Sequence, residues 1–147
     1  MADLPIEELA LQKMRECPQA AALGMETVSW EGAVANLRVP YKPELVGDPD
    51  TGVIAGGVVT TLLDHACGQA VMAAMGAPAP IATLDLRIDY MRAAEPGLDI
   101  HARAHCYKLT HSIAFVRATA YDRDVNDPVA AAQAAFMLTG PAEAATS

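Results

Sequence analysis

The stretch GVIAGGVVTTLLDHACGQAVMAAM, residues 52–75, decides the fold of this 147-residue chain. From about Gly57 to Met75 it is apolar on most sides and rich in small residues, which predicts a helix enclosed by protein. Its apolar character is interrupted by polar residues, among them Thr60, Asp64, His65 and Gln69. These polar residues, together with several glycines, argue against a membrane span.

Strands are predicted after this helix. An alternation of apolar and polar residues over 82–91 predicts a strand with Thr83 and Asp85 on its polar face. Further strands are expected over 98–106, 113–121 and 129–138. The last is rich in alanine and would be helical by propensity, but its entry through Pro128 and its place after three strands favour a strand.

The segment before the helix is predicted to contain one helix, one hairpin and one loop. Residues 1–20 include a short amphipathic helix that ends before Pro18. Two strands over 24–30 and 33–39 flank Glu31-Gly32, which is typical of a hairpin. The following stretch, 41–57, contains two prolines and several glycines and is expected to be a loop.

The expected architecture is α+β, with one antiparallel sheet of five to six strands curled around one central helix. A sheet must bury its apolar face, and the helix at 57–75 is the only sufficiently apolar element. We expect one domain over residues 21–140, preceded by the N-terminal helical segment 1–20 and followed by a flexible tail at 141–147.

Composition excludes some classes of function. The net charge of -8 and the pI near 4.8 disfavour nucleic acid as a partner, but they allow a small ligand that carries phosphate. Three cysteines without C-x-x-C spacing indicate neither a disulfide framework nor a zinc site, and they favour a reducing cytoplasm. The acidic, amphipathic start is not typical of a signal peptide.

The helical stretch and the strand TLDLRIDYMRAA, residues 83–94, resemble the hot-dog thioesterases of the phenylacetate-pathway type. The resemblance covers roughly residues 21–139. It implies a His-Gly-Gly at the helix start and an acidic residue one to two turns inside the helix. The chain keeps Gly56, Gly57 and Asp64, but it has Ala55 where the histidine commonly stands. The polar residue that the family often has in the preceding loop has no clear match.

Asp64 is the expected chemical centre, because a carboxylate within an apolar helix is costly to bury unless it is paired, exposed or used. It would act as a base toward water or as a nucleophile, and the alternative is a surface-facing aspartate. Gly56 and Gly57 would present N–H groups at the helix start to the thioester oxygen. Alternatively, the two glycines serve only a tight entry to the helix.

The spacing of these residues predicts a site made by two subunits. Gly56 and Asp64 are eight positions apart, or ~12 Å along a helix, whereas a reacting carbon must lie about 3 Å from both groups. Hot-dog enzymes resemble this arrangement, because they pair two sheets edge to edge with antiparallel helices. We therefore expect a homodimer or a dimer of dimers, without a membrane or nucleic-acid partner.

Further candidate residues have less support from the sequence. The resemblance implies that Thr83 holds the attacking water or orients Asp64. Arg92, Lys108 and His111 lie near strand ends or turns and could bind coenzyme A phosphates, although solvated surface charge is an equal alternative. The pair His101 and His105 is assigned to the surface or to sheet packing rather than to a metal.

The leading function is hydrolysis of an acyl-CoA thioester, with coenzyme A as part of the substrate and no separate cofactor or metal. A hot-dog hydratase or dehydratase is a second possibility, but Ala55 removes its usual histidine. A third is a non-catalytic acyl-CoA binding module. Few aromatic residues and many alanines and methionines permit either an aryl or a medium alkyl group.

Overall fold

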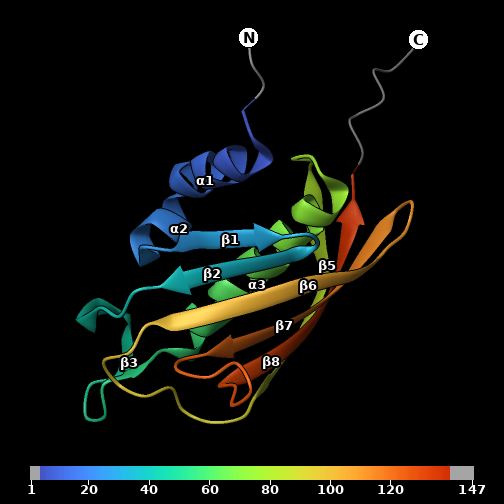
Figure 1. The fold of residues 1–147 in the computed structure, drawn as a ribbon. Helices are drawn as coiled ribbons and strands as arrows, with labels where there is room; N and C mark the ends of the chain where they lie inside the picture. The colour runs from blue at the N-terminus through green and yellow to red at the C-terminus, as the bar shows by residue number, and fades with distance from the viewer. Residues whose placement is uncertain (1–3, 140–147) are drawn as a thin grey trace.

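The structure is a computed structural model and describes residues 4–139 (Figure 1). Its elements are, in chain order, α1 (Ile6–Glu16), α2 (Pro18–Leu23), β1 (Glu26–Glu31), β2 (Val34–Val39), the 3-10 helix η1 (Pro43–Leu45), β3 (Val46–Asp48), β4 (Val53–Ile54), α3 (Gly56–Met75), β5 (Ile81–Tyr90), β6 (Ile100–Leu109), β7 (Ile113–Tyr121) and β8 (Ala130–Leu138).

Six strands form one antiparallel sheet in the order β1-β2-β6-β7-β8-β5, and α3 lies against one of its faces (Figure 1). Helix α1 packs beside β1, and a small β3–β4 hairpin leads into α3. The predicted sheet around one central helix is confirmed. The alanine-rich segment is a strand, β8, as expected from its place in the chain.

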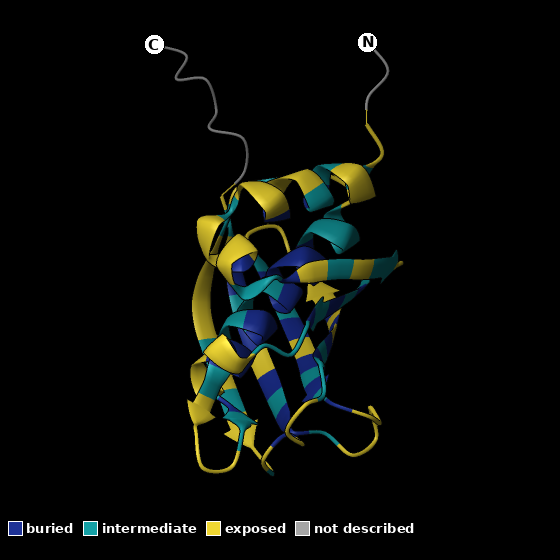
Figure 2. Ribbon diagram, turned by 90° about the vertical axis from the view of Figure 1, so that its left-hand side faces the viewer, coloured by how far each residue is buried: buried dark blue, intermediate teal, exposed yellow. Residues whose placement is uncertain are grey.

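The core lies between α3 and the sheet (Figure 2). Helix residues Leu62, Leu63 and Val71 are fully buried there. Facing strands supply small side chains, including Ala130, Ala132 and Ala134 of β8. Small residues let the helix approach the sheet closely, which explains why a strand can be rich in alanine. Helix α3 is long and apolar enough to span a membrane by length and composition, but here it is the core helix.

Strand β5 forms an exposed edge of the sheet. Within residues 4–139 it pairs with β8 alone, so its other side has free backbone groups. Large apolar side chains are exposed there, with Leu84 at 50% and Tyr90 at 52% of their full accessibility. A long free edge with exposed apolar residues is typical of a strand that pairs with another chain.

The predicted placement of Thr83 on the polar face with Asp85 is wrong. Thr83 pairs with Phe136 and Asp85 pairs with Ala135, so Leu84 is one extra residue in β5. Such a β-bulge reverses the alternation of side chains. As a result Thr83 points toward α3, whereas Asp85 lies on the opposite face of the sheet.

Smaller differences concern the N-terminal half. The single helix expected before Pro18 is followed by a second one, α2, which begins at Pro18 and ends before Gly24 in a left-handed conformation. The expected loop at 41–57 contains η1 and the β3–β4 hairpin. The predicted flexible tail at 141–147 lies outside the described residues.

Candidate functional site

Asp64 lies in the middle of α3, half-buried, beside the free-edge strand. Its Oδ1 accepts a hydrogen bond of 2.9 Å from the hydroxyl of Thr83. Both residues line a hollow of 260 Å³ with an otherwise largely apolar wall. The wall includes Met14, Cys17, Met72, Ile81 and Phe136. The structure therefore places the predicted acid next to the predicted hydroxyl, at the mouth of an apolar hollow.

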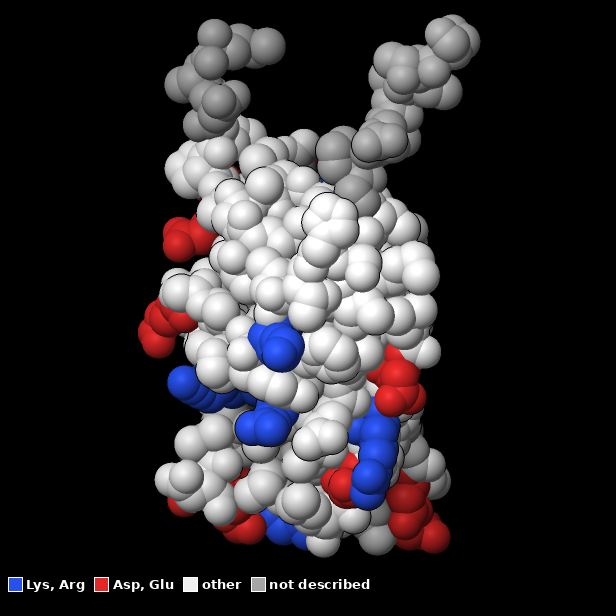
Figure 3. Space-filling view, turned by 90° about the vertical axis from the view of Figure 1, so that its right-hand side faces the viewer, with Lys and Arg blue, Asp and Glu red and all other residues white. Residues whose placement is uncertain are grey.

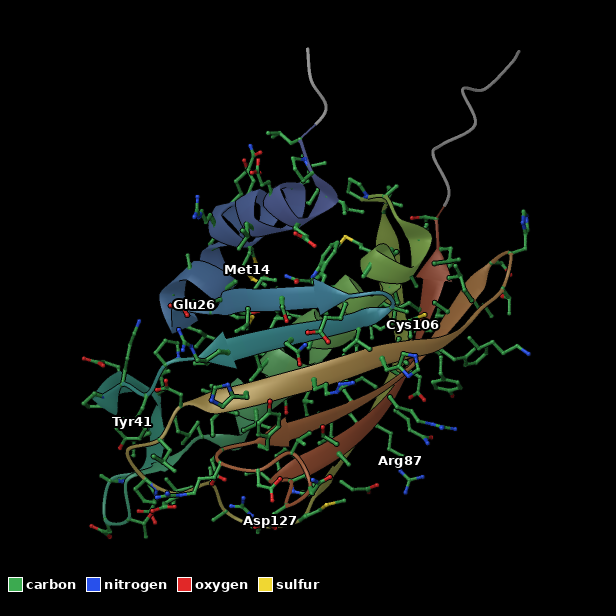
Figure 4. The ribbon with its side chains drawn as sticks, in the orientation of Figure 1. Met14, Glu26, Tyr41, Arg87, Cys106 and Asp127 are labelled. Atoms are coloured by element: carbon green, nitrogen blue, oxygen red, sulfur yellow. The ribbon has the colours of Figure 1, made fainter. Side chains whose placement is uncertain are left out.

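Helix α1 closes one side of this hollow through Ala10, Lys13 and Met14, and Figure 4 shows Met14 between α1 and β1. Gln69, only 4% exposed, lines the same hollow. Its carbonyl accepts hydrogen bonds from Thr27 at 3.0 Å and from the Trp30 indole at 2.9 Å. These bonds fix α3 to β1 and hold the wall of the hollow in place.

Two neighbours of Asp64 are held uncharged by burial. Burial lowers the pKa of His65, although the charge of Asp64 opposes this shift, and no hydrogen bond joins these two residues in the described chain. Burial raises the pKa of the Cys67 thiol to about 12. Cys67 therefore remains protonated at neutral pH and is a packing residue rather than a thiolate nucleophile.

The start of α3 presents free backbone donors. Gly56 and Gly57 are both exposed, and no hydrogen bond formed within residues 4–139 uses either N–H. The carbonyl of Gly56 accepts a hydrogen bond of 2.9 Å from Tyr90, and the Thr60 hydroxyl lies within hydrogen-bond distance of both that carbonyl, at 3.2 Å, and the Tyr90 hydroxyl. The helix start is therefore fixed while its N–H groups remain available to an anionic oxygen.

Asp64 and Gly56 of one chain do not share a site. Gly56 lines a second hollow of 370 Å³, and the two hollows have no lining residue in common. Asp64 is bonded to Thr83 near the start of β5, and Gly56 is bonded to Tyr90 at its end. The two groups therefore lie beside opposite ends of the same exposed edge.

Arg92, predicted to bind phosphate, lines the second hollow, but its guanidinium is already paired. It donates to both carboxylate oxygens of Asp122 at 2.6 and 2.9 Å and reaches Asp127. This bidentate contact, with backbone N–H groups of Glu95 and Arg123, holds the pKa of Asp122 well below its usual range. Arg92 thus fixes the loop after β5, and its role toward coenzyme A stays a prediction.

The two other residues predicted to bind phosphate lie outside both hollows. Lys108 and His111 are exposed at the β6–β7 hairpin and line neither one. Their role also stays a prediction. His101 stacks on Tyr121 with ring centroids 5.3 Å apart, which confirms its assignment to sheet packing.

A family model described as the thioesterase superfamily matches residues 51–129, more than half of the chain. The chain belongs to the thioesterase superfamily. The match includes Gly56, Gly57, Asp64 and Thr83 and all residues that line the hollow beside Gly56, whereas the hollow beside Asp64 also has lining residues outside the match, including Met14 and Phe136.

The names of two related proteins agree with membership in the thioesterase superfamily. The medium/long-chain acyl-CoA thioesterase YigI of Salmonella typhimurium is 26% identical over 82% of this chain and 85% of its own. A Halobacterium salinarum protein with the name of an esterase is 37% identical over 79 residues. This second match spans about half of each chain, 52% in both cases.

Solved structures share the fold. A Pseudomonas aeruginosa protein is 36% identical, with a TM-score of 0.83 over 90% of this chain and 98% of its own. The PaaI protein of the E. coli phenylacetic acid degradation operon is 18% identical, with a TM-score of 0.76 over 92% and 96%. The hot-dog fold is therefore confirmed, and it is shared with the phenylacetic acid degradation protein.

Several residues around the two hollows were not predicted from the sequence. Tyr90 was assigned only to a strand, yet its hydroxyl fixes the start of α3. Lys13, His65 and Gln69 line the hollow beside Asp64. His65 and Gln69 were visible as polar interruptions of an apolar helix, and this signal could have marked them as wall residues.

Proposed function

We propose that this thioesterase superfamily protein hydrolyses an acyl-CoA thioester to a free acid and CoA. The observation that supports this most is the pairing of Asp64 with the Thr83 hydroxyl at an apolar hollow. A carboxylate held by one hydroxyl keeps its other oxygen free for chemistry. That oxygen either takes a proton from the attacking water or attacks the acyl carbon itself.

The negative charge that develops on the thioester oxygen is stabilised by the N–H of Gly56 from the neighbouring subunit. Its free donor and the ~12 Å that separates it from Asp64 along α3 support this arrangement. The exposed edge of β5 lies between the two groups. Two antiparallel copies of β5 would bring the Asp64 end of one chain to the Gly56 end of the other, so each dimer has two sites.

The acyl group occupies the hollow beside Asp64. Most of its wall is apolar and suits an aryl or alkyl group, and the polar side chains Lys13, His65 and Gln69 complete it. The relative from Salmonella typhimurium is named for medium and long acyl chains, which supports an alkyl group. The CoA moiety enters as part of the substrate, and the reaction needs no further cofactor.

The direct test is a free-thiol assay over short, medium, long and aryl acyl-CoA substrates, with the mass in solution measured alongside. We expect saturable release of CoA from at least one class and a mass of two chains or a multiple of two. Binding of acyl-CoA without release of thiol from any class would instead identify a non-catalytic binding module.

Thr83 is expected to position Asp64 rather than to react. Thr83→Val removes the hydrogen bond to a charged group, which is worth about 1.5–3 kcal/mol, so kcat should fall by roughly one to two orders of magnitude. Thr83→Ser keeps the hydroxyl and serves as the matched control, with kcat close to that of the natural protein. Equal rates for the valine and serine variants would show that the contact has no role in turnover.

A further inference from the structure

We propose that the side-chain amide of Gln69 donates a hydrogen bond to an uncharged oxygen on the acyl group, so that the chain prefers acyl-CoA thioesters whose acyl group carries an acceptor such as an oxo group. This inference rests on the proposed thioesterase function. It narrows the class of substrate at the same hollow.

The side chain of Gln69 is held in one orientation. It is only 4% exposed, and its Oε1 accepts hydrogen bonds from the Thr27 hydroxyl at 3.0 Å and from the Trp30 indole at 2.9 Å. An indole N–H can only donate, so the amide atom that it contacts must be the oxygen. The Nε2 of Gln69 therefore lies on the side of the amide away from these two donors.

The N–H groups on Nε2 are free for a ligand. No hydrogen bond formed within residues 4–139 uses this atom, whereas every fully buried side-chain nitrogen or oxygen in this part of the chain has a partner. Nε2 must therefore keep access to open space, and Gln69 lines the hollow beside Asp64. A fixed donor in a mostly apolar hollow favours a ligand that accepts its hydrogen bond, because any other ligand leaves the donor unpaired.

The acceptor is expected to be uncharged. A carboxylate on the acyl group would be repelled by Asp64, which lines the same hollow. Lys13 also lines it, but Lys13 is exposed and its ammonium can reach water. On the flank beside β5, charged groups lie mainly in the lower half, whereas the half that contains the end of α3 and the start of β5 is mostly uncharged (Figure 3).

The spacing along α3 places the acceptor away from the thioester. Gln69 is five positions beyond Asp64, or ~7.5 Å along the helix. The reacting carbon lies at Asp64 in the proposed mechanism. The oxygen that Gln69 contacts must therefore be carried several carbons further along the acyl group.

The test compares each of a series of oxo-acyl-CoA substrates, with the oxo group moved along the chain, with the alkyl acyl-CoA of the same length. We expect kcat/KM to be about ten- to hundredfold higher for the oxo substrate at one best position, the discrimination typical of a buried hydrogen bond. Gln69→Met removes the amide and should bring this ratio to about one. Gln133→Met is the matched control at an exposed position on the opposite face of the sheet, and it should keep the ratio.

A second variant keeps the test decisive if the methionine variant does not fold. Gln69→Glu can still accept hydrogen bonds from Thr27 and Trp30, but it lacks the amide N–H groups. It should also lose the preference for the oxo substrate. Thermal unfolding shows which variants are folded.

Binding can be measured apart from turnover. Trp30 is the only tryptophan of the chain and its indole contacts Gln69, so its fluorescence reports binding at this end of the hollow. In an Asp64→Asn background, which should leave most of the substrate intact, the oxo compound should bind about tenfold more tightly than its alkyl match.

Equal kcat/KM for both members of every pair would overturn the inference, as would a preference that persists in the folded Gln69 variants. If no substrate releases CoA, the affinities decide. Tighter binding of the oxo compound then supports the inference while the proposed function alone fails, and equal affinities contradict both.

Discussion

Replacement of Asp64 by asparagine is expected to lower kcat by roughly two to four orders of magnitude, the usual contribution of a positioned proton-transfer group. Asparagine keeps the size of the side chain and can still accept the hydrogen bond from Thr83. It can neither take a proton from water nor attack the acyl carbon. The fold should survive, because Asp64 is half-buried and the substitution replaces a charged side chain on an apolar helix with a neutral one.

The measurement is steady-state thiol release with the substrate that the natural protein prefers, together with thermal unfolding and mass in solution. Asp50→Asn is the matched control, because it makes the same chemical change in the exposed turn before β4, away from both hollows. Turnover by the Asp64 variant within a few-fold of the control would remove Asp64 from the mechanism.

Replacement of Gly56 by proline is expected to lower kcat by a factor of roughly 10²–10³, the cost of losing one oxyanion donor. Proline removes only the N–H, and the first position of a helix accepts proline well. The preceding Ala55 already has φ -60° and ψ 138°, which suits a residue before proline. The helix start should therefore remain intact.

Gly56→Ala is the control for this change, because it adds a side chain but keeps the N–H. A methyl group at this position would meet the Tyr90 ring at 3.8 Å, an ordinary contact. The alanine variant should keep most of its turnover, and both variants should keep the mass of the natural protein. If the proline and alanine variants have equal kcat values, any loss of turnover comes from the added side chain, and Gly56 donates no catalytic hydrogen bond.

The sequence predicts most of the fold because most of its elements have a strong local pattern. Helix α3 follows from a long apolar run with small residues, and β6 and β7 follow from alternation. The helix α2 was missed, although Pro18 at its first position and Gly24 after its end are the usual signals of a short helix. Six residues are too few to produce a clear period, so these end signals were the only ones available.

The site is less predictable, because its contacts depend on pairing between distant segments. Asp64 and Gly56 stand out in the sequence as a charge in an apolar helix and a glycine pair at its start. Thr83 was placed on the wrong face, because the extra residue Leu84 is set by the register against β8 and leaves no local mark. The contact of Tyr90 with Gly56 likewise joins residues 34 positions apart.

The central claim is that one site uses Asp64 of one subunit and Gly56 of the other. Asp64→Asn and Gly56→Pro chains, each with its own affinity tag, can be co-expressed, and the heterodimer purified through both tags. In that heterodimer one site has both changes, whereas the other pairs an intact Asp64 with an intact Gly56. We expect a kcat per dimer of about half the natural value, since a symmetric dimer has two equivalent sites. A heterodimer as inactive as its two parents would contradict the claim, because it would mean that each site uses both groups from a single chain.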